Sequence, residues 1–124
     1  MQKELKLFKN FENKRSWVSL KDFTDKEREI LSEILFKIYE DTEINTEAYN
    51  LFIVATSTDK YGIVNRFDLI YFKDNIRLEL KNIYCGGGYG SNRIFDAIYN
   101  LVSELGFKNA VEVTNYIYYH CAFF

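Results

Sequence analysis

Two stretches of the chain repeat apolar residues at the spacing of an α-helix with one buried face. The first covers residues 25–40 and follows a capping box, in which the Thr24 hydroxyl and the Glu27 carboxylate each accept a backbone N–H. The second covers about residues 92–105, and Gly106 is well placed to end it. The buried stripes are Ile30, Leu31, Ile34, Leu35 and Ile38 in the first helix and Ile94, Phe95, Ile98, Leu101, Val102 and Leu105 in the second.

Short runs of apolar residues predict the strands. The run 51–56 is continuously apolar and rich in β-branched residues, which is typical of a central strand buried on both faces. Residues 76–81 alternate most clearly, with inward-facing Ile76, Leu78 and Leu80 between charged residues. Residues 3–11 form either a short first strand or an arm that packs on a neighbour. Further strands are expected at 14–20 and 63–72, with turns at 58–62 and 73–75.

The end of the chain reads as a last strand over 111–119, because Val111, Val113 and Ile117 alternate with polar residues. Phe123 and Phe124 follow and would be exposed unless another surface covers them, which indicates a subunit contact. The order of elements predicts an α+β fold: a mostly antiparallel sheet of four to six strands with two amphipathic helices packed on it.

Composition narrows the class of protein. With 124 residues the chain is expected to form a single domain, 1–124, and 48% apolar residues make disorder improbable. The net charge of −2 argues against binding duplex nucleic acid. No apolar run approaches membrane-spanning length, no signal peptide is recognisable, and two cysteines read as reduced thiols. A cytoplasmic protein is expected.

A glycine-rich loop joins the strand that begins at Ile76 to the second helix. Four of the six glycines lie within residues 86–90, and Ser91 and Asn92 follow at the expected helix start. Glycines adopt positive φ angles and let a ligand approach the main chain, while unpaired N–H groups at a helix N-terminus attract phosphate. The loop lacks the Gly-Lys-Ser/Thr of a P-loop, and Ser91 breaks the dinucleotide fingerprint. It is therefore either a tight connection or a site for a nucleotide-like anion.

Side chains around this loop complete the predicted ligand site. Tyr84 and Tyr89 flank the glycines and suit stacking on a nucleotide base. Arg93, at the helix start, and Arg28, in the first turn of the first helix, would add positive charge. Trp17 is either a core or interface anchor or a second stacking group. The predicted ligand-binding residues are Trp17, Arg28, Tyr84, Gly88, Tyr89, Gly90, Ser91, Asn92 and Arg93.

Few residues in the sequence indicate a catalytic site. Cys85 borders the loop and is either a nucleophile or, more simply, a small buried cysteine. The single histidine, His120, reads as a surface group, and the pair His120-Cys121 lacks the companions that zinc needs. Asp96 either complements the helix dipole or recognises a ribose hydroxyl. We therefore predict a protein that is not an enzyme and needs no metal or cofactor.

Several of these features together resemble the phage Thoeris anti-defence 1 family. They are the Trp17-Val18-Ser19-Leu20 lead-in to the capped helix, the three-strand meander, and the Gly-Gly-Gly-Tyr-Gly-Ser-Asn loop. The resemblance implies a sponge that sequesters glycocyclic ADP-ribose isomers, made by TIR-domain defence enzymes, without cleaving them. It also implies sites between the subunits of dimers that assemble further into hexamers, with cyclic oligonucleotides bound elsewhere in some members. By this resemblance Asn92 lines the pocket, and Gly90 and Ser91 offer backbone donors.

The sequence thus predicts a cytoplasmic, homo-oligomeric anti-defence protein that captures a cyclic ADP-ribose-type signal inside the infected cell. Two other hypotheses stay open. One is a protein-binding inhibitor, of the immunity or anti-CRISPR type, that acts through its acidic first helix. The other is a small nucleotide-processing enzyme that uses Cys85.

Overall fold

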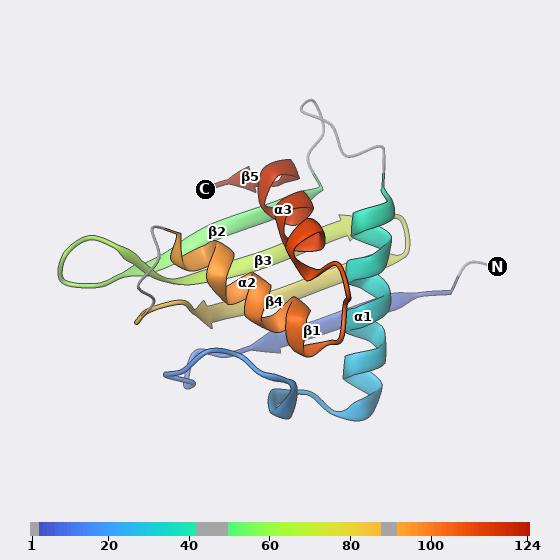
Figure 1. Cartoon of the computed structure of the whole chain (residues 1–124), viewed down its shortest axis with the longest axis horizontal. Coiled ribbons are helices and arrows are strands. Elements are labelled where there is room, and N and C mark those ends of the chain that lie inside the picture. Colours follow the sequence, from blue (N-terminus) through green and yellow to red (C-terminus); the bar gives the residue numbers. More distant parts are fainter. Residues whose placement is uncertain (1–2, 42–49, 88–91) are drawn as a thin grey trace.

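Within the described part of the chain, five strands form one mixed sheet and three α-helices pack on one of its faces (Figure 1). This computed structural model describes residues 3–41, 50–87 and 92–124. The sheet order is β1-β4-β3-β2-β5. The elements are β1 (Leu5–Asn10), a 3₁₀ turn η1 (Leu20–Asp22), α1 (Asp25–Glu40), β2 (Leu51–Thr58), β3 (Val64–Lys73), β4 (Ile76–Tyr84), α2 (Arg93–Glu104), α3 (Ala110–His120) and β5 (Ala122–Phe123).

The sheet is built on an antiparallel meander, β2-β3-β4, which accounts for its longest strands and most of its pairing. β1 adds to one edge, parallel to β4, and the two-residue β5 adds to the other, parallel to β2. The α+β class, the strand number and the mostly antiparallel pairing are therefore confirmed.

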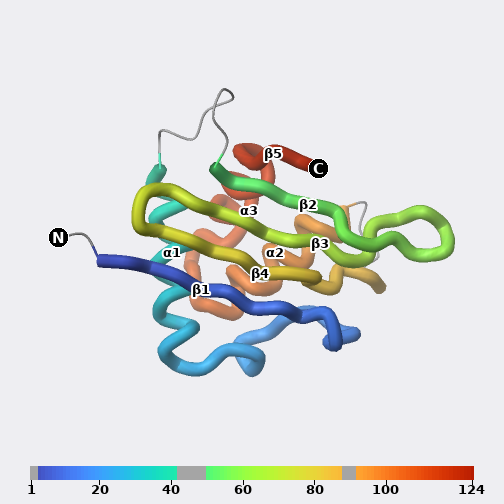
Figure 2. The backbone as a smooth tube through the Cα atoms, turned by 180° about the vertical axis from the view of Figure 1, so that it is seen from behind, coloured from blue at the N-terminus to red at the C-terminus, as the bar shows by residue number. Residues whose placement is uncertain are grey.

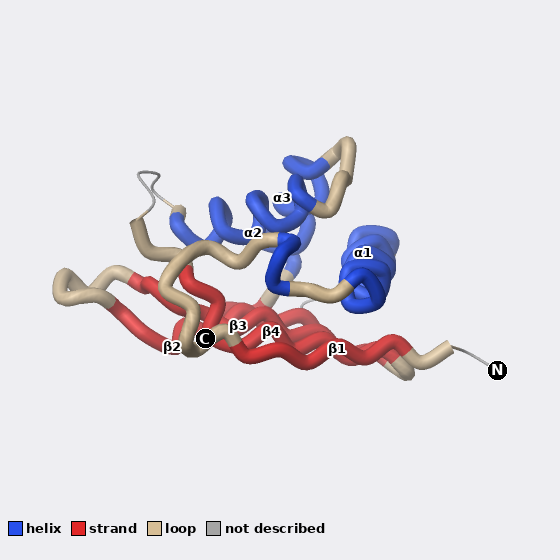
Figure 3. Tube along the Cα trace, turned by 90° about the horizontal axis from the view of Figure 1, so that it is seen from below, coloured by secondary structure: helices blue, strands red, loops and turns tan. Residues whose placement is uncertain are grey.

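All three helices lie on the same side of the sheet (Figure 3). Their apolar stripes and the inward residues of the strands form one core. α1 begins and ends where its sequence pattern predicts, and its capping box is present: Thr24 Oγ1 accepts the Glu27 N–H at 3.1 Å, and Glu27 Oε1 accepts the Thr24 N–H at 2.8 Å. Gly106 follows α2 with φ +90°, as a helix stop requires.

The prediction of only two helices is wrong, because residues 110–120 form α3 instead of a strand. Their buried positions recur at spacings of three and four, which is the helical period, whereas Val111 is 52% exposed. Val111, Val113 and Ile117 fit alternation only when Thr114, which is fully buried, is counted as an outward residue. The buried residues of α3 are Ala110, Val113, Thr114 and Ile117.

Two strand predictions also need correction. Residues 14–20 do not form a strand; this segment runs beside the end of α2 and enters η1 and α1, with Val18 buried in the core. β2 is neither central nor covered on both faces, since it lies next to the edge strand β5 and only Leu51 and Ile53 are buried within it. Its alternate residues face the side of the sheet without helices, where contact with water is tolerated.

A β-bulge shapes the end of β4 that leads to the glycine loop. Lys81 and Asn82 together lie opposite the single residue Asp68, and Asn82 takes a positive φ of 58°. The Asp68 carboxylate accepts the Asn82 N–H at 2.8 Å and pairs with the Lys81 ammonium at 3.3 Å. The bulge therefore fixes the direction of the end of β4, and with it the position of Tyr84 at the start of the glycine turn.

Candidate functional site

The segment that follows β1 is anchored to the glycine turn by Trp17. The indole Nε1 donates a hydrogen bond to the Gly86 carbonyl oxygen at 3.0 Å. Tyr84 lies against the same glycine, because a Cβ added to Gly86 would come within 2.6 Å of the Tyr84 hydroxyl oxygen. Two of the predicted aromatic groups, 67 positions apart in numbering, thus meet at the start of the turn.

The first two glycines of the turn present backbone donors. Gly87 has φ +77°, a left-handed conformation that other residues adopt at a cost, with nothing within 4 Å of a Cβ placed there. The peptide between Gly86 and Gly87 is trans, so its N–H points away from the carbonyl that Trp17 holds. Within the described residues, nothing accepts a hydrogen bond from the N–H of Gly86 or of Gly87.

The N-terminus of α2 supplies two more donors. Asn92 is the N-cap, and its Oδ1 accepts the Phe95 N–H at 3.0 Å. Asp96, in the first turn, complements the helix dipole. The N–H groups of Arg93 and Ile94 have no acceptor among the described residues, as expected for the first positions of a helix. The Asn92 side chain therefore organises the helix end by capping it.

Arg66, which the sequence analysis did not single out, is the cation next to the turn. Its guanidinium carbon lies 5.4 Å from the centre of the Tyr84 ring. The guanidinium also donates to three carbonyl oxygens: Phe11 at 3.1 Å, Asn82 at 2.9 Å and Lys14 at 2.7 Å. Only the strand register, which pairs Arg66 with Tyr84, brings these two residues together.

Arg93 lies at the site but is held by a carboxylate. Its Nη1 is 3.0 Å from Asp59 Oδ2, in the turn between β2 and β3. Asp59 also accepts the N–H groups of Tyr61 and Ile63 at 2.8 Å and 3.1 Å. Hydrogen bonding from the Ile63 N–H, together with Tyr61 and Arg93, lowers the pKa of Asp59. This network fixes the start of α2 to the β2–β3 turn.

Cys85 is a poor nucleophile in this environment. The side chain is fully buried, and Sγ lies 3.6 Å from the Val64 carbonyl oxygen. Burial raises the pKa of the Cys85 thiol to about 11, against the opposing effect of Arg93 and Arg66. Very little thiolate is present at neutral pH. Beside it, the Oδ1 atom of Asn65 is buried and has no hydrogen-bond partner in the part of the chain that is described.

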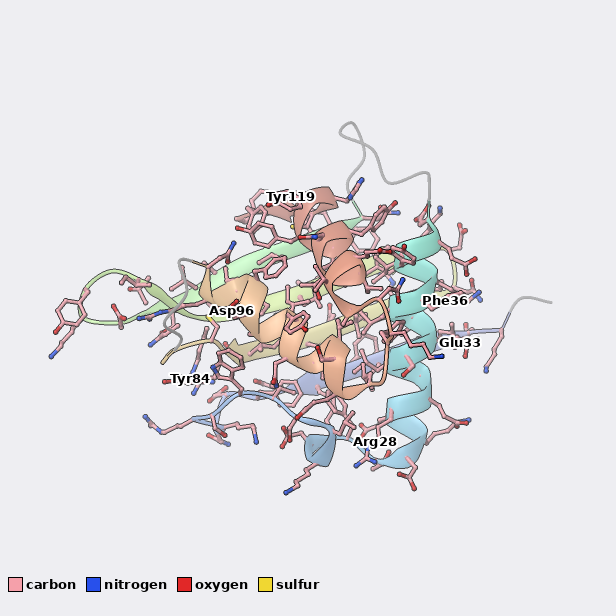
Figure 4. The ribbon with its side chains drawn as sticks, in the orientation of Figure 1. Arg28, Glu33, Phe36, Tyr84, Asp96 and Tyr119 are labelled. Carbon is pink, nitrogen blue, oxygen red and sulfur yellow. The ribbon has the colours of Figure 1, made fainter. Side chains whose placement is uncertain are left out.

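The structure does not bring Arg28 to this site. Arg28 lies at the foot of α1, well away from Tyr84 (Figure 4). Its Nε donates to the Leu20 carbonyl oxygen at 3.0 Å, and Nη1 is 3.5 Å from Asp25 Oδ1. Gly88, Tyr89, Gly90 and Ser91, which were also predicted to bind ligand, lie outside the described residues.

Arg28 instead lines an open groove of about 640 Å³ between α1 and the connection from α2 to α3. Phe36, which is half exposed, lies in this groove on α1 (Figure 4). The remaining lining residues are Leu20, Glu29, Ser32, Glu33, Leu105 and Phe107.

A second polar cleft, of about 430 Å³, lies near the C-terminus of α1. The Tyr71 hydroxyl donates to Asp41 Oδ2 at 3.0 Å, and Lys73 Nζ lies 2.9 Å from Asp41 Oδ1. Burial and the Asp41 carboxylate raise the pKa of Tyr71, so the phenol stays protonated. These side chains satisfy one another's hydrogen-bonding groups. The contacts in the cleft therefore have a structural role, which is to hold the end of α1 against β3.

No group of three or more potential metal ligands occurs in residues 3–41, 50–87 and 92–124. Over the same residues, no helix is both long and apolar enough to cross a membrane. No protein-family model, curated protein or solved structure matches this chain.

Proposed function

We propose that the protein binds a phosphate-bearing nucleotide at the turn between β4 and α2. The observation that carries the proposal is the set of backbone N–H groups without described acceptors on both sides of the turn: Gly86 and Gly87 before it, Arg93 and Ile94 after it. Unpaired N–H groups at a helix N-terminus, together with the positive end of the helix dipole, favour a phosphate group.

The surrounding side chains support a nucleotide over a simple anion. Trp17 and Tyr84 are partly buried aromatic groups at the same glycine, and a base can stack on such surfaces. Arg66 adds positive charge beside them. Arg93 is neutralised by Asp59, so Arg66 is the cation on which the proposal relies.

We propose further that the ligand is a cyclic ADP-ribose isomer and that the protein sequesters it without cleavage, as a phage anti-defence sponge. This assignment is supported by the resemblance to the Thoeris anti-defence 1 family and by the unreactive state of Cys85. Under this proposal the protein acts as an oligomer in the cytoplasm of the infected cell. A nucleotide of about 35 heavy atoms at roughly 0.3 kcal/mol per atom would bind with about 10 kcal/mol, or tens of nanomolar.

Isothermal titration calorimetry with glycocyclic ADP-ribose tests binding, and mass spectrometry of ligand released by heating tests sequestration. We expect tight binding and recovery of intact ligand. Recovery of a hydrolysed product would show an enzyme, and the Cys85→Ser variant would then identify whether this thiol takes part. Absence of binding by any cyclic nucleotide would reject the nucleotide proposal altogether.

A second candidate function, inhibition of a protein target through α1, is favoured by Phe36. This side chain is 50% exposed on an otherwise charged helix face and lies in the groove beside Phe107. Exposed aromatic groups in a groove with a polar border are common contact points between proteins. Phe36→Ala would abolish capture of such a target and leave nucleotide binding at the β4–α2 turn unchanged.

A further inference from the structure

The face of the sheet opposite the helices carries apolar side chains. Seen from behind, the strands lie in front of all three helices (Figure 2). Residues that alternate with the core positions therefore face outward here: Phe52 and Val54 on β2, Ile70 and Phe72 on β3, and Phe8 on β1. Phe8 is 57% exposed and Phe72 36%. No described helix covers this surface, which we call the open face.

A row of side chains packed ring to ring crosses the open face. The Arg77 guanidinium lies 5.1 Å from the centre of the Phe72 ring, Phe72 stacks on Phe52 at 5.7 Å, and Phe52 meets Phe124 at 5.9 Å. Arg77 comes from β4 and Phe52 from β2, so they flank the Phe72 ring from the two strands that neighbour β3.

The charges on the open face are of both signs and lie to one side. Lys6 pairs in register with Arg77 on neighbouring strands, and Glu79 lies between Phe8 and Ile70. Most of the apolar residues gather over β2 and β3, with Phe8 apart on β1, and the exposed charged residues lie over β1 and β4. Asp68 on β3 shares this face, but it is buried and paired with Lys81. An apolar centre with a charged border is the arrangement found in protein interfaces.

The side chains of the open face favour some binding partners over others. Single-stranded nucleic acid needs free ring faces for base stacking and a positive surface. On the open face Arg77 and Phe52 lie beside the Phe72 ring, and the negatively charged Glu79 lies between Phe8 and Ile70. The chain as a whole carries a net charge of −2. A neutral apolar surface with mixed border charges can instead match a copy of itself, since a two-fold interface uses the same patch twice.

We propose that the open face is the interface of a homodimer, in which two sheets pack face to face. A two-fold axis over β2 and β3 places the apolar halves together, at the roughly 10 Å separation of packed sheets, and leaves Lys6, Arg77 and Glu79 at the border. Four strands about 4.8 Å apart and roughly 25 Å long bury about 500 Å² on each copy, or roughly 1,000 Å² in total. That area is near the lower limit for a specific interface, so the dimer dissociates on dilution. This inference is independent of whether a nucleotide binds.

Sedimentation equilibrium over a wide range of concentrations tests the proposal with three variants of the full chain. Phe72→Glu introduces a charge into the apolar part of the interface and should give a monomer at every concentration. Phe124→Lys does the same from a side chain that is 73% exposed, where a substitution leaves the core intact. Tyr119→Glu is the matched control, because Tyr119 is an equally exposed aromatic residue (74%) on α3 in the helix layer (Figure 4) and the variant should remain a dimer.

Circular dichroism identifies a variant that fails to fold, in which case Phe124→Lys replaces Phe72→Glu as the decisive one. A wild-type chain that is monomeric at all concentrations overturns the proposal. It is equally overturned when folded Phe72→Glu and Phe124→Lys both stay dimeric, or when Tyr119→Glu alone dissociates. A monomeric wild type that binds a fluorescent oligonucleotide, and loses it in Phe72→Glu, would assign the open face to nucleic acid instead.

Discussion

The indole of Trp17 donates its hydrogen bond to the carbonyl of Gly86, 69 residues further along the chain, at 3.0 Å. This single contact joins the segment between β1 and α1 to the start of the glycine turn. It also fixes the peptide that leads into Gly87, and with it the direction of the next N–H. A side chain that the sequence leaves ambiguous, as anchor or stacking group, is thus an anchor at the proposed site.

Trp17→Phe should weaken both the fold and the site, because the Gly86 carbonyl loses its donor while an aromatic ring remains. A lost hydrogen bond of this kind costs about 1 kcal/mol, which urea denaturation can measure. Since Trp17 is the only tryptophan, its fluorescence in the wild-type protein should also change when nucleotide is added. Unchanged fluorescence at saturating ligand would separate Trp17 from the binding site.

Gly87→Ala and Gly62→Ala make a matched pair. Both glycines have left-handed φ angles, of +77° and +79°, with no atom within 4 Å of an added Cβ. Each substitution should therefore cost about 1 kcal/mol of stability from backbone strain alone. Only Gly87→Ala should reduce nucleotide affinity, because Gly62 lies in the β2–β3 turn. Equal affinities in titration calorimetry would show that the Gly87 backbone takes no part in binding.

Arg66→Met should be strongly destabilising, since three carbonyl oxygens lose a charged donor at once. Allowing for partial exposure, we expect a loss of about 2–3 kcal/mol in the free energy of unfolding. The exposed Arg15→Met is the control and should change stability by less than about 0.5 kcal/mol. Similar losses in the two variants would mean that the Arg66 contacts contribute little.

The stability contributed by Asp59 should depend on pH with a definite sign. Its pKa is lowered in the folded protein by the N–H groups of Ile63 and Tyr61 and by Arg93. The ionised carboxylate therefore stabilises the fold above the ordinary carboxyl pKa of about 4, and this contribution disappears as the pH falls through the lowered folded pKa. Melting temperatures of wild type and Asp59→Asn should differ at pH 7 and converge on acidification. A difference that grows with acid would contradict this assignment.

Sequence patterns predicted the parts of the fold that local chemistry determines. α1 matches its predicted bounds because Thr24 and Glu27 cap it and the apolar stripe continues without interruption. α3 was missed because Val113 and Ile117 suit either period, while the two residues that decide between the periods mislead: Val111 is apolar but exposed, and Thr114 is polar but buried. The uncovered side of β2 could not be predicted either, since an apolar run does not say which of its faces meets helices.

The candidate site likewise contains some parts that the local sequence predicts and others that it does not. Its glycine turn and the Asn92 cap are visible in the sequence, because both depend on neighbouring residues. Arg66 and Asp59 were not, because they reach the turn through strand register and a distant hairpin. Arg28 was assigned to the site from its unusual position near a helix start, but the structure shows that Leu20 and Asp25 hold it.

The most direct test of the account is an NMR titration of the backbone amides with glycocyclic ADP-ribose. The proposal predicts that the largest shifts occur at Gly86, Gly87, Arg93 and Ile94, whose N–H groups have no acceptor among the described residues. Shifts that instead gather along the groove at Phe36, or no shifts at all at ligand concentrations far above the expected dissociation constant, would contradict it.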